Sequence, residues 1–165
     1  MLIVRATRKL LTHLGPPGLR DSHRGTTKLG QWYANVLPWR PRVTLLVNEA
    51  TLLPVLMPMA PSATWAIRVG DQVAAVLHAH YAPAEFIAEE RAHMRECVLG
   101  TTANRSVVGV MNEFAFLADL HRENAQAVDL LELAVRLAAT PCGPLYRRHV
   151  SPDRELAAAL RTLSA

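Results

Sequence analysis

The sequence predicts an α+β fold: a small antiparallel sheet with a central β-hairpin, covered by about five or six helices. Three observations favour it. Residues 42–58, RVTLLVNEATLLPVLMP, have two apolar runs on either side of a short polar connection, which is typical of a hairpin. Several other segments have apolar residues at helical spacing, between Pro and Gly breaks. Half of the 165 residues are hydrophobic, so we expect one core and a single globular domain over residues 1–165.

The N-terminal quarter is predicted to contain one strand and two helices. LIV, residues 2–4, favours a short strand, and residues 7–14 favour a brief helix. GPPGLRDSHRG has turn residues and charges but no apolar periodicity, so we expect a mobile loop over residues 15–26. A helix is expected within residues 26–39, because Pro38 would end it and five apolar residues fall at helical spacing: Leu29, Trp32, Tyr33, Val36 and Leu37.

The chain after the hairpin is predicted to be mostly helical. Ser62 is expected to cap a helix that reaches about residue 78, and Pro83 to lie in the first turn of the next helix. CVLG, residues 97–100, predicts a short returning strand. A helical C-terminal part follows over residues 124–165, with one helix at residues 125–139 and another after residue 151.

The segment TTANRSVVGVMNEFAFLADL, residues 101–120, combines helix signals with an unusual polar side. Asn104 or Thr102 can cap this helix. A rotation of about 100° per residue puts five apolar residues on one side, which we expect to face the core: Val107, Val110, Met111, Phe114 and Leu117. The opposite side has four members, with Glu113 beside them: Arg105, Gly109, Asn112 and Phe116.

Gly109 is the informative member of this side, because a glycine within a helix costs roughly 1 kcal/mol relative to alanine. Two interpretations are open. A ligand or another segment approaches the backbone at Gly109, where Arg105 can bind a carboxylate or phosphate and Asn112 can donate and accept hydrogen bonds. Alternatively, Arg105 pairs with an acid and Gly109 only admits a packed side chain.

Positive charge is concentrated at the N-terminus. Residues 1–42 contain eight Lys and Arg residues and a single acid, Asp21, whereas the whole chain has a net charge of only +4. Such a basic segment either attracts phosphates or an acidic partner, or forms an ordinary solvated surface. Both interpretations are open at this stage.

Several motifs together resemble an uncharacterised bacterial family, a domain of unknown function of about this length. The motifs are RATRKLL, WYAN, the LLVNEATLLPVLMP hairpin, TANRSVVGVMNEFAF and TPCGPL, and they extend over nearly the whole chain. Arg8 departs from the pair of lysines found in many relatives, and the position of Tyr33 varies among them. The resemblance implies no established activity, but it identifies the polar residues chosen on physical grounds as signature positions of the family.

Other classes of site have little support in the sequence. His78 and His80 would point about 200° apart on a helix, so no metal site is expected. Phosphate-binding glycine motifs are absent, and we expect no cofactor. Cys97 and Cys142 have no metal or redox spacing, which favours buried thiols and a cytoplasmic protein. The longest apolar run is too short and proline-rich to cross a membrane.

We therefore expect a protein that binds an anionic or phosphate-bearing ligand, with nucleic acid as one candidate. Arg5, Lys9 and Arg105 would supply positive charge, while Asn35 and Asn112 would orient the ligand. The full set of candidate ligand-binding residues is Arg5, Thr7, Lys9, Trp32, Asn35, Asn48, Arg105, Ser106 and Asn112.

Two alternatives belong to other classes of function. The first is a small enzyme acting on an anionic substrate, in which Glu113 is the acid and base, Arg105 holds the anion and Asn112 orients it. The second is a protein-interaction module resembling an antitoxin, or a homo-oligomer. The hypothesis of a site requires the opening strand, the tryptophan segment and the helix at Arg105 to meet in space.

Overall fold

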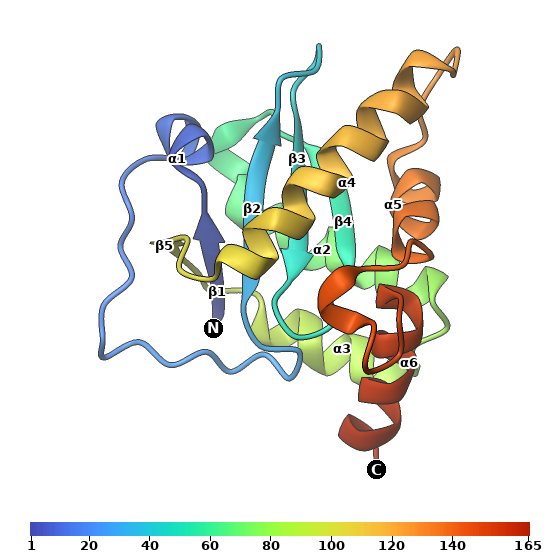
Figure 1. Ribbon diagram of the computed structural model, residues 1–165. Coiled ribbons are helices and arrows are strands. Elements are labelled where there is room, and N and C mark those ends of the chain that lie inside the picture. The colour runs from blue at the N-terminus through green and yellow to red at the C-terminus, as the bar shows by residue number, and fades with distance from the viewer.

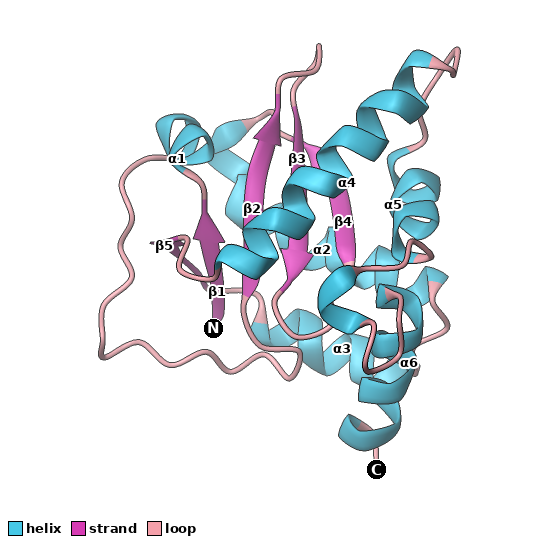
Figure 2. Cartoon of the chain, viewed as in Figure 1, coloured by secondary structure: helices cyan, strands magenta, loops and turns pink.

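The computed structural model describes residues 1–165 and has an α+β fold, as predicted, with helices on both faces of one sheet (Figures 1 and 2). The sheet has five strands in the order β4-β3-β2-β1-β5. The expected hairpin is confirmed as β3 (Val43–Asn48) and β4 (Pro54–Pro58), and CVLG lies in β5 (Cys97–Thr101) as predicted.

The expectation of a purely antiparallel sheet is wrong, because the sheet is mixed. Strand β1 (Leu2–Ala6) is parallel to both of its neighbours, β2 (Trp32–Leu37) and β5. Only the pairs β2–β3 and β3–β4 are antiparallel. A parallel pair needs a long crossover connection, and the 25 residues between β1 and β2 provide one, through helix α1 (Arg8–Leu14) and a loop.

The helix expected within residues 26–39 is also wrong, since its apolar part forms the inner strand β2. All side chains of β2 except Asn35 are buried, because β2 lies between two strands and is covered on both faces. In such a strand, apolar residues occur at nearly every position, so a helical spacing can be found among them by coincidence. Trp32, Tyr33 and Val36 are also residue types that strands favour.

Helices α2 (Trp65–Ala79) and α3 (Ala84–His93) carry the chain from β4 to β5. Helix α2 lies behind the sheet and contacts β4, and α3 packs against α2 near the lower ends of the strands in Figure 1. Ser62 does not cap α2 as expected. It begins a 3₁₀ turn, η1 (Ser62–Thr64), whose last residue precedes α2 without a side-chain cap. Pro83 immediately precedes α3, close to its predicted place in the first turn.

The opposite face is covered by α4 (Arg105–Glu123), which crosses β2 and β3 diagonally (Figure 1). Asn104 caps this helix as predicted, since its side chain accepts hydrogen bonds from the backbone of Ser106 and Val107. The predicted core side is buried except for Leu117, which is half-buried. None of the helices combines the length and the apolar character that crossing a membrane requires.

The C-terminal part packs against strand β4 through helix α5 (Leu130–Ala138). Helix α5 also contacts α2, and α6 (Pro152–Leu163) contacts α5. A short turn, η2 (Gly143–Leu145), lies between them. The helix predicted at residues 125–139 begins five residues later than expected, because Asp129 accepts a hydrogen bond from the backbone of Glu132 and caps it there.

Candidate anion-binding site

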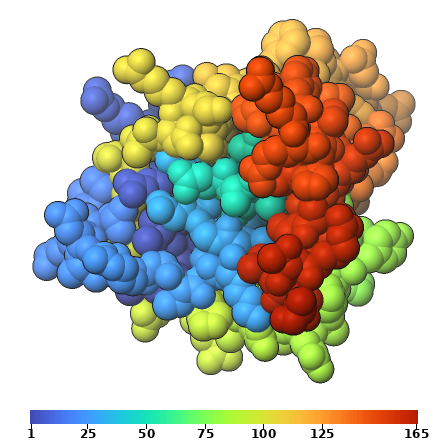
Figure 3. All heavy atoms as spheres, turned by 60° about the horizontal axis from the view of Figure 1, so that its bottom comes forward, coloured from blue at the N-terminus to red at the C-terminus, as the bar shows by residue number.

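The candidate site lies where residues 17–25 pass over strands β1 and β5. The backbone amides of Gly18 and Leu19 both donate to the carbonyl oxygen of Leu99, at 2.9 Å each. Leu19 also packs on Gly100, where a Cβ atom would approach Leu19 Cδ2 to 2.6 Å. In the space-filling view, these N-terminal residues cover one flank of the molecule (Figure 3). Residues 18 and 19 thereby attach this loop to strand β5.

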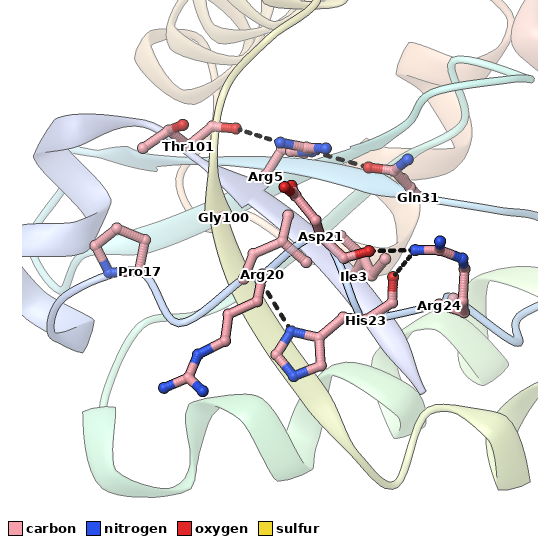
Figure 4. Close-up of a pocket in the computed structure, with 12 residues that line it drawn as sticks. Ile3, Arg5, Pro17, Arg20, Asp21, His23, Arg24, Gln31, Gly100 and Thr101 are labelled. Atoms are coloured by element: carbon pink, nitrogen blue, oxygen red, sulfur yellow. Dashed lines mark hydrogen bonds between the residues drawn. The ribbon is translucent and has the colours of Figure 1, made fainter.

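Beside this contact is an open cavity of about 550 Å³. Its lining on the sheet side includes Arg5, Gln31 and Thr101, and its lining on the loop side includes Arg20, His23 and Arg24 (Figure 4). Only two of the twelve lining residues are hydrophobic, and Asp21 is the sole carboxylate among them. The cavity is therefore polar and carries an excess of positive charge.

Arg5 is the central cation of this cavity. Its Nε donates to Gln31 Oε1 at 2.9 Å, and its Nη1 donates to the carbonyl oxygen of Thr101 at 3.3 Å. Both acceptors are neutral, and Nη2 has no protein partner. These two contacts fix the plane of the guanidinium group while N–H groups stay free to donate to another acceptor.

The arginines of the cavity have no carboxylate partner. The ion pairs of the protein join Lys28 to Glu89, Arg91 to Asp71, Arg136 to Glu132, and Arg148 to Glu155, which also contacts the His149 ring. Arg24 donates to the carbonyl oxygens of Asp21 and His23 within its own loop. Arg20 extends its guanidinium group away from Arg5 in Figure 4. The charge of the cavity is therefore not neutralised by ion pairs of the chain.

Tyr33 links this part of the sheet to the beginning of α4. Tyr33 pairs with Arg5 across β1 and β2, so the two side chains share one face of the sheet. The Tyr33 hydroxyl accepts a hydrogen bond from the Asn104 amide at 3.0 Å. Burial, and secondly the nearby charge of Glu49, raises the pKa of Tyr33 above its ordinary value. The hydroxyl is therefore neutral at physiological pH and acts as a fixed hydrogen-bonding group.

The structure brings the opening strand, the tryptophan segment and the start of α4 together, but only some of the candidate residues lie at the cavity. Arg5 lines it, whereas Lys9 and Arg105 are exposed and do not. Thr7 donates to Asn35 Oδ1 at 2.6 Å, on the same face as Arg5. Thr7 also caps α1, so both side chains have a structural role beside the cavity.

Trp32 and Asn48 are fully buried and have no surface to offer a ligand. The amide of Asn48 donates to the carbonyl oxygen of Leu29 at 2.9 Å, and its Oδ1 accepts from the backbone of Ala50 and Thr51. Asn48 therefore holds the turn after β3 against the segment that precedes β2. Trp32 Nε1 is buried without a hydrogen-bond partner.

The polar side of α4 faces outward. Arg105, Ser106, Gly109 and Asn112 are exposed, and nothing lies within 4 Å of where a Gly109 side chain would begin. No side chain or neighbouring segment therefore packs against Gly109. Glu113 is exposed on another flank of the helix, where its charge contributes, after burial, to raising the pKa of Cys142 to about 11. These residues do not line the cavity at Arg5.

Arg5 is the only one of the twelve lining residues among the candidates from the sequence, and the other four lining side chains that contain nitrogen were not among them: Arg20, His23, Arg24 and Gln31. Three of them lie in the segment expected to be a mobile loop, whose lack of apolar periodicity concealed how it would fold. The signal available was the charge of the N-terminal quarter. The described structure contains no group of three or more His, Cys, Asp or Glu residues arranged to hold a metal ion.

Comparison with known proteins agrees with the resemblance seen in the sequence motifs. The family model described as a domain of unknown function (DUF6933) matches residues 3–155. No curated protein and no solved structure matches the chain.

Proposed function

We propose that this chain, which belongs to the family described as a domain of unknown function (DUF6933), binds an anionic or phosphate-bearing ligand in the cavity at Arg5. The proposed role is binding through charge-assisted hydrogen bonds. Arg5 is the main contact, and Gln31 and Thr101 hold its guanidinium group in place.

One observation carries this proposal: Arg5 is a partly buried arginine on an inner strand, oriented by two neutral acceptors and without a carboxylate partner. Buried arginines are usually paired, because removing a guanidinium group from water costs free energy that an anion compensates. A phosphate or carboxylate from solution would supply that missing partner. The guanidinium group also matches the two oxygens of such a ligand geometrically.

The rim of the cavity supports the same ligand class. Arg20 and Arg24 add two positive charges opposite a single acid, Asp21. Their field favours an anion that carries more than one negative charge, such as a phosphate ester. The enzyme alternative gains no support from the geometry, because Glu113, Arg105 and Asn112 do not line this cavity.

Calorimetric titration with inorganic phosphate and with pyrophosphate at low ionic strength tests the proposal. Arg5→Gln is expected to weaken binding about 10- to 100-fold, since a hydrogen bond to a charged group contributes about 1.5–3 kcal/mol. Arg5→Lys keeps the charge but loses the planar fork, so it should bind with intermediate affinity. Arg91→Gln, which removes an arginine paired with Asp71 elsewhere on the surface, is the matched control. Equal affinities for the wild type and Arg5→Gln, or no binding of either anion, would refute the proposal.

A further inference from the structure

A second group of cations lies outside the cavity, at the end of the sheet where β2 turns into β3. We call it the basic arc, and its members are Arg8, Lys9, Arg40, Arg42, Arg68 and Arg122. Arg8 and Lys9 begin α1, Arg40 and Arg42 lie in the β2–β3 turn, Arg68 is in α2, and Arg122 is near the end of α4. Figure 1 shows α1, the β2–β3 turn and the end of α4 following one another along the upper side of the molecule.

Contacts between neighbouring elements connect the segments that carry the basic arc. Helix α1 contacts both β2 and η1. Arg68 donates to the carbonyl oxygens of Met59 and Pro61, which precede η1, and the amide of Met59 donates to the carbonyl oxygen of Arg42. At the other side of the turn, the Arg122 guanidinium lies 4.9 Å from the centre of the Trp39 ring.

No member of the basic arc forms an ion pair. Arg68 bonds only neutral oxygens, and Arg122 contacts an aromatic ring, so both keep their full charge. The acid that contacts the turn is Asp119, whose carboxylate accepts the indole N–H of Trp39 at 2.6 Å. Arg8, Lys9, Arg40 and Arg42 have exposed side chains and no contact with an acid.

We infer that the basic arc binds the phosphate backbone of a nucleic acid without reading its sequence. Separate cations that follow one another along one end match a polymer with regularly repeated negative charges better than a single small anion. Five of the six are arginines, which contact phosphates with two parallel hydrogen bonds. Trp39 is only 5% exposed and is covered by Arg122, so it offers no platform on which bases could stack.

This inference is independent of the proposed cavity site, because the basic arc and the lining of the cavity share no residue. The two can therefore fail separately. Arg5→Gln should weaken the binding of phosphate in the cavity about 10- to 100-fold and leave the binding of nucleic acid unchanged. Variants of the basic arc should weaken the binding of nucleic acid and leave the binding of phosphate in the cavity unchanged.

The test is fluorescence anisotropy with two labelled DNA duplexes of equal length and unrelated sequence, measured over a range of salt concentrations. The wild type should bind both equally, and the logarithm of its affinity should fall linearly with the logarithm of salt concentration. Arg40→Ala/Arg42→Ala and Arg8→Ala/Lys9→Ala should each reduce that slope, by about 0.9 for every phosphate that the variant no longer binds. Each double variant should also weaken binding about tenfold or more at low salt.

The matched control is Arg91→Ala/Arg136→Ala, which removes two arginines that form ion pairs on other surfaces. Circular dichroism of every variant checks that it is folded. An equal loss in the control would show that net charge alone is responsible and would overturn the inference. Failure to bind either duplex, equal binding of poly-glutamate, or tighter binding to phosphatidylserine vesicles than to DNA would also overturn it.

Discussion

Glu90 is a carboxylate without exposed surface whose role is to hold the segment before β2 in place. Its two oxygens accept hydrogen bonds from the backbone amides of Lys28 and Leu29, at 2.7 and 3.0 Å. Burial raises the pKa of Glu90, and these two amides act in the opposite direction. A side chain of α3 thereby fixes the end of the loop that covers the cavity.

Replacing Glu90 with alanine is expected to destabilise the protein by about 2–4 kcal/mol, because two backbone amides, one of them buried, lose their acceptor. Urea denaturation followed by circular dichroism measures this change in the free energy of unfolding. The neighbouring Glu89 is exposed and pairs only with the side chain of Lys28, so Glu89→Ala should have a much smaller effect. Similar losses for both variants would contradict the role given to Glu90.

Sequence reasoning succeeded for residues whose role depends on their immediate neighbours. The cap at Asn104 and the apolar side of α4 follow from local periodicity, and the structure agrees with both. Arg5 was singled out, but its partners Gln31 and Thr101 are 26 and 96 residues away along the chain. Which residues become such partners depends on the tertiary fold, and local sequence patterns do not predict contacts so far apart along the chain. Arg20 and Arg24 were missed for the same reason.

Among the elements, β2 shows most clearly why a local pattern can mislead. Its side chains are covered on both faces, so neither strict alternation nor a true helical face is present. The hairpin β3–β4 was predicted correctly although β3 is buried throughout, because turn residues mark both of its ends. The hairpin shows two apolar runs on either side of a polar connection, whereas β2 is a single run between Gly30 and Pro38, and such breaks end a helix as readily as a strand.

The loop over the cavity depends on the absence of a side chain at Gly100. A Cβ atom there would lie 2.6 Å from Leu19 Cδ2 and 3.2 Å from Leu19 Cβ. The second contact involves the root of the side chain, so a rotation of Leu19 alone does not relieve it. The backbone of residues 17–25 would have to move away from β5.

Gly100→Ala is therefore expected to displace this loop. Tryptic cleavage after Arg20 and Arg24 should become several-fold faster, since local opening of the segment becomes easier, and the affinity for phosphate should fall. Gly109→Ala is the control, because its side chain would enter open space. That control should stabilise α4 by about 0.5–1 kcal/mol and leave the cleavage unchanged. Unaltered proteolysis of Gly100→Ala would show that Leu19 does not hold the loop.

For the whole molecule, the α+β class followed from the sequence but the mixed sheet did not. The parallel pairing of β1 with β2 and β5 joins segments separated by long connections, and period-two patterns are the same in either direction. The concentration of positive charge at the N-terminus was visible in the sequence, but its distribution over two separate surfaces was not. The basic N-terminal segment contributes Arg5, Arg20 and Arg24 to the cavity, and Arg8, Lys9, Arg40 and Arg42 to the basic arc. One segment thus supplies two surfaces.

The reactivity of the two thiols measures how tightly the molecule is packed, at the edge of the sheet and in the core. Cys97 is half-buried in the edge strand β5, and Cys142 is fully buried where η2 begins. Burial raises the pKa of Cys97 to about 12 and that of Cys142 to about 11. At pH 8 the thiolate, which is the reactive form, is at most about one molecule in a thousand for either residue.

We therefore expect both thiols of the native protein to react with Ellman's reagent far more slowly than those of the urea-unfolded chain. Because Cys142 lies in the central core, its reaction should require global unfolding, and the logarithm of its rate should increase in Glu90→Ala in proportion to the lost stability. Cys97 should react through opening of the edge strand, so Gly100→Ala should accelerate Cys97 more than Cys142. The variants Cys97→Ser and Cys142→Ser, each tested alone, assign the two rates. A native Cys142 that reacts as fast as the unfolded thiol would contradict the burial of Cys142 in the core.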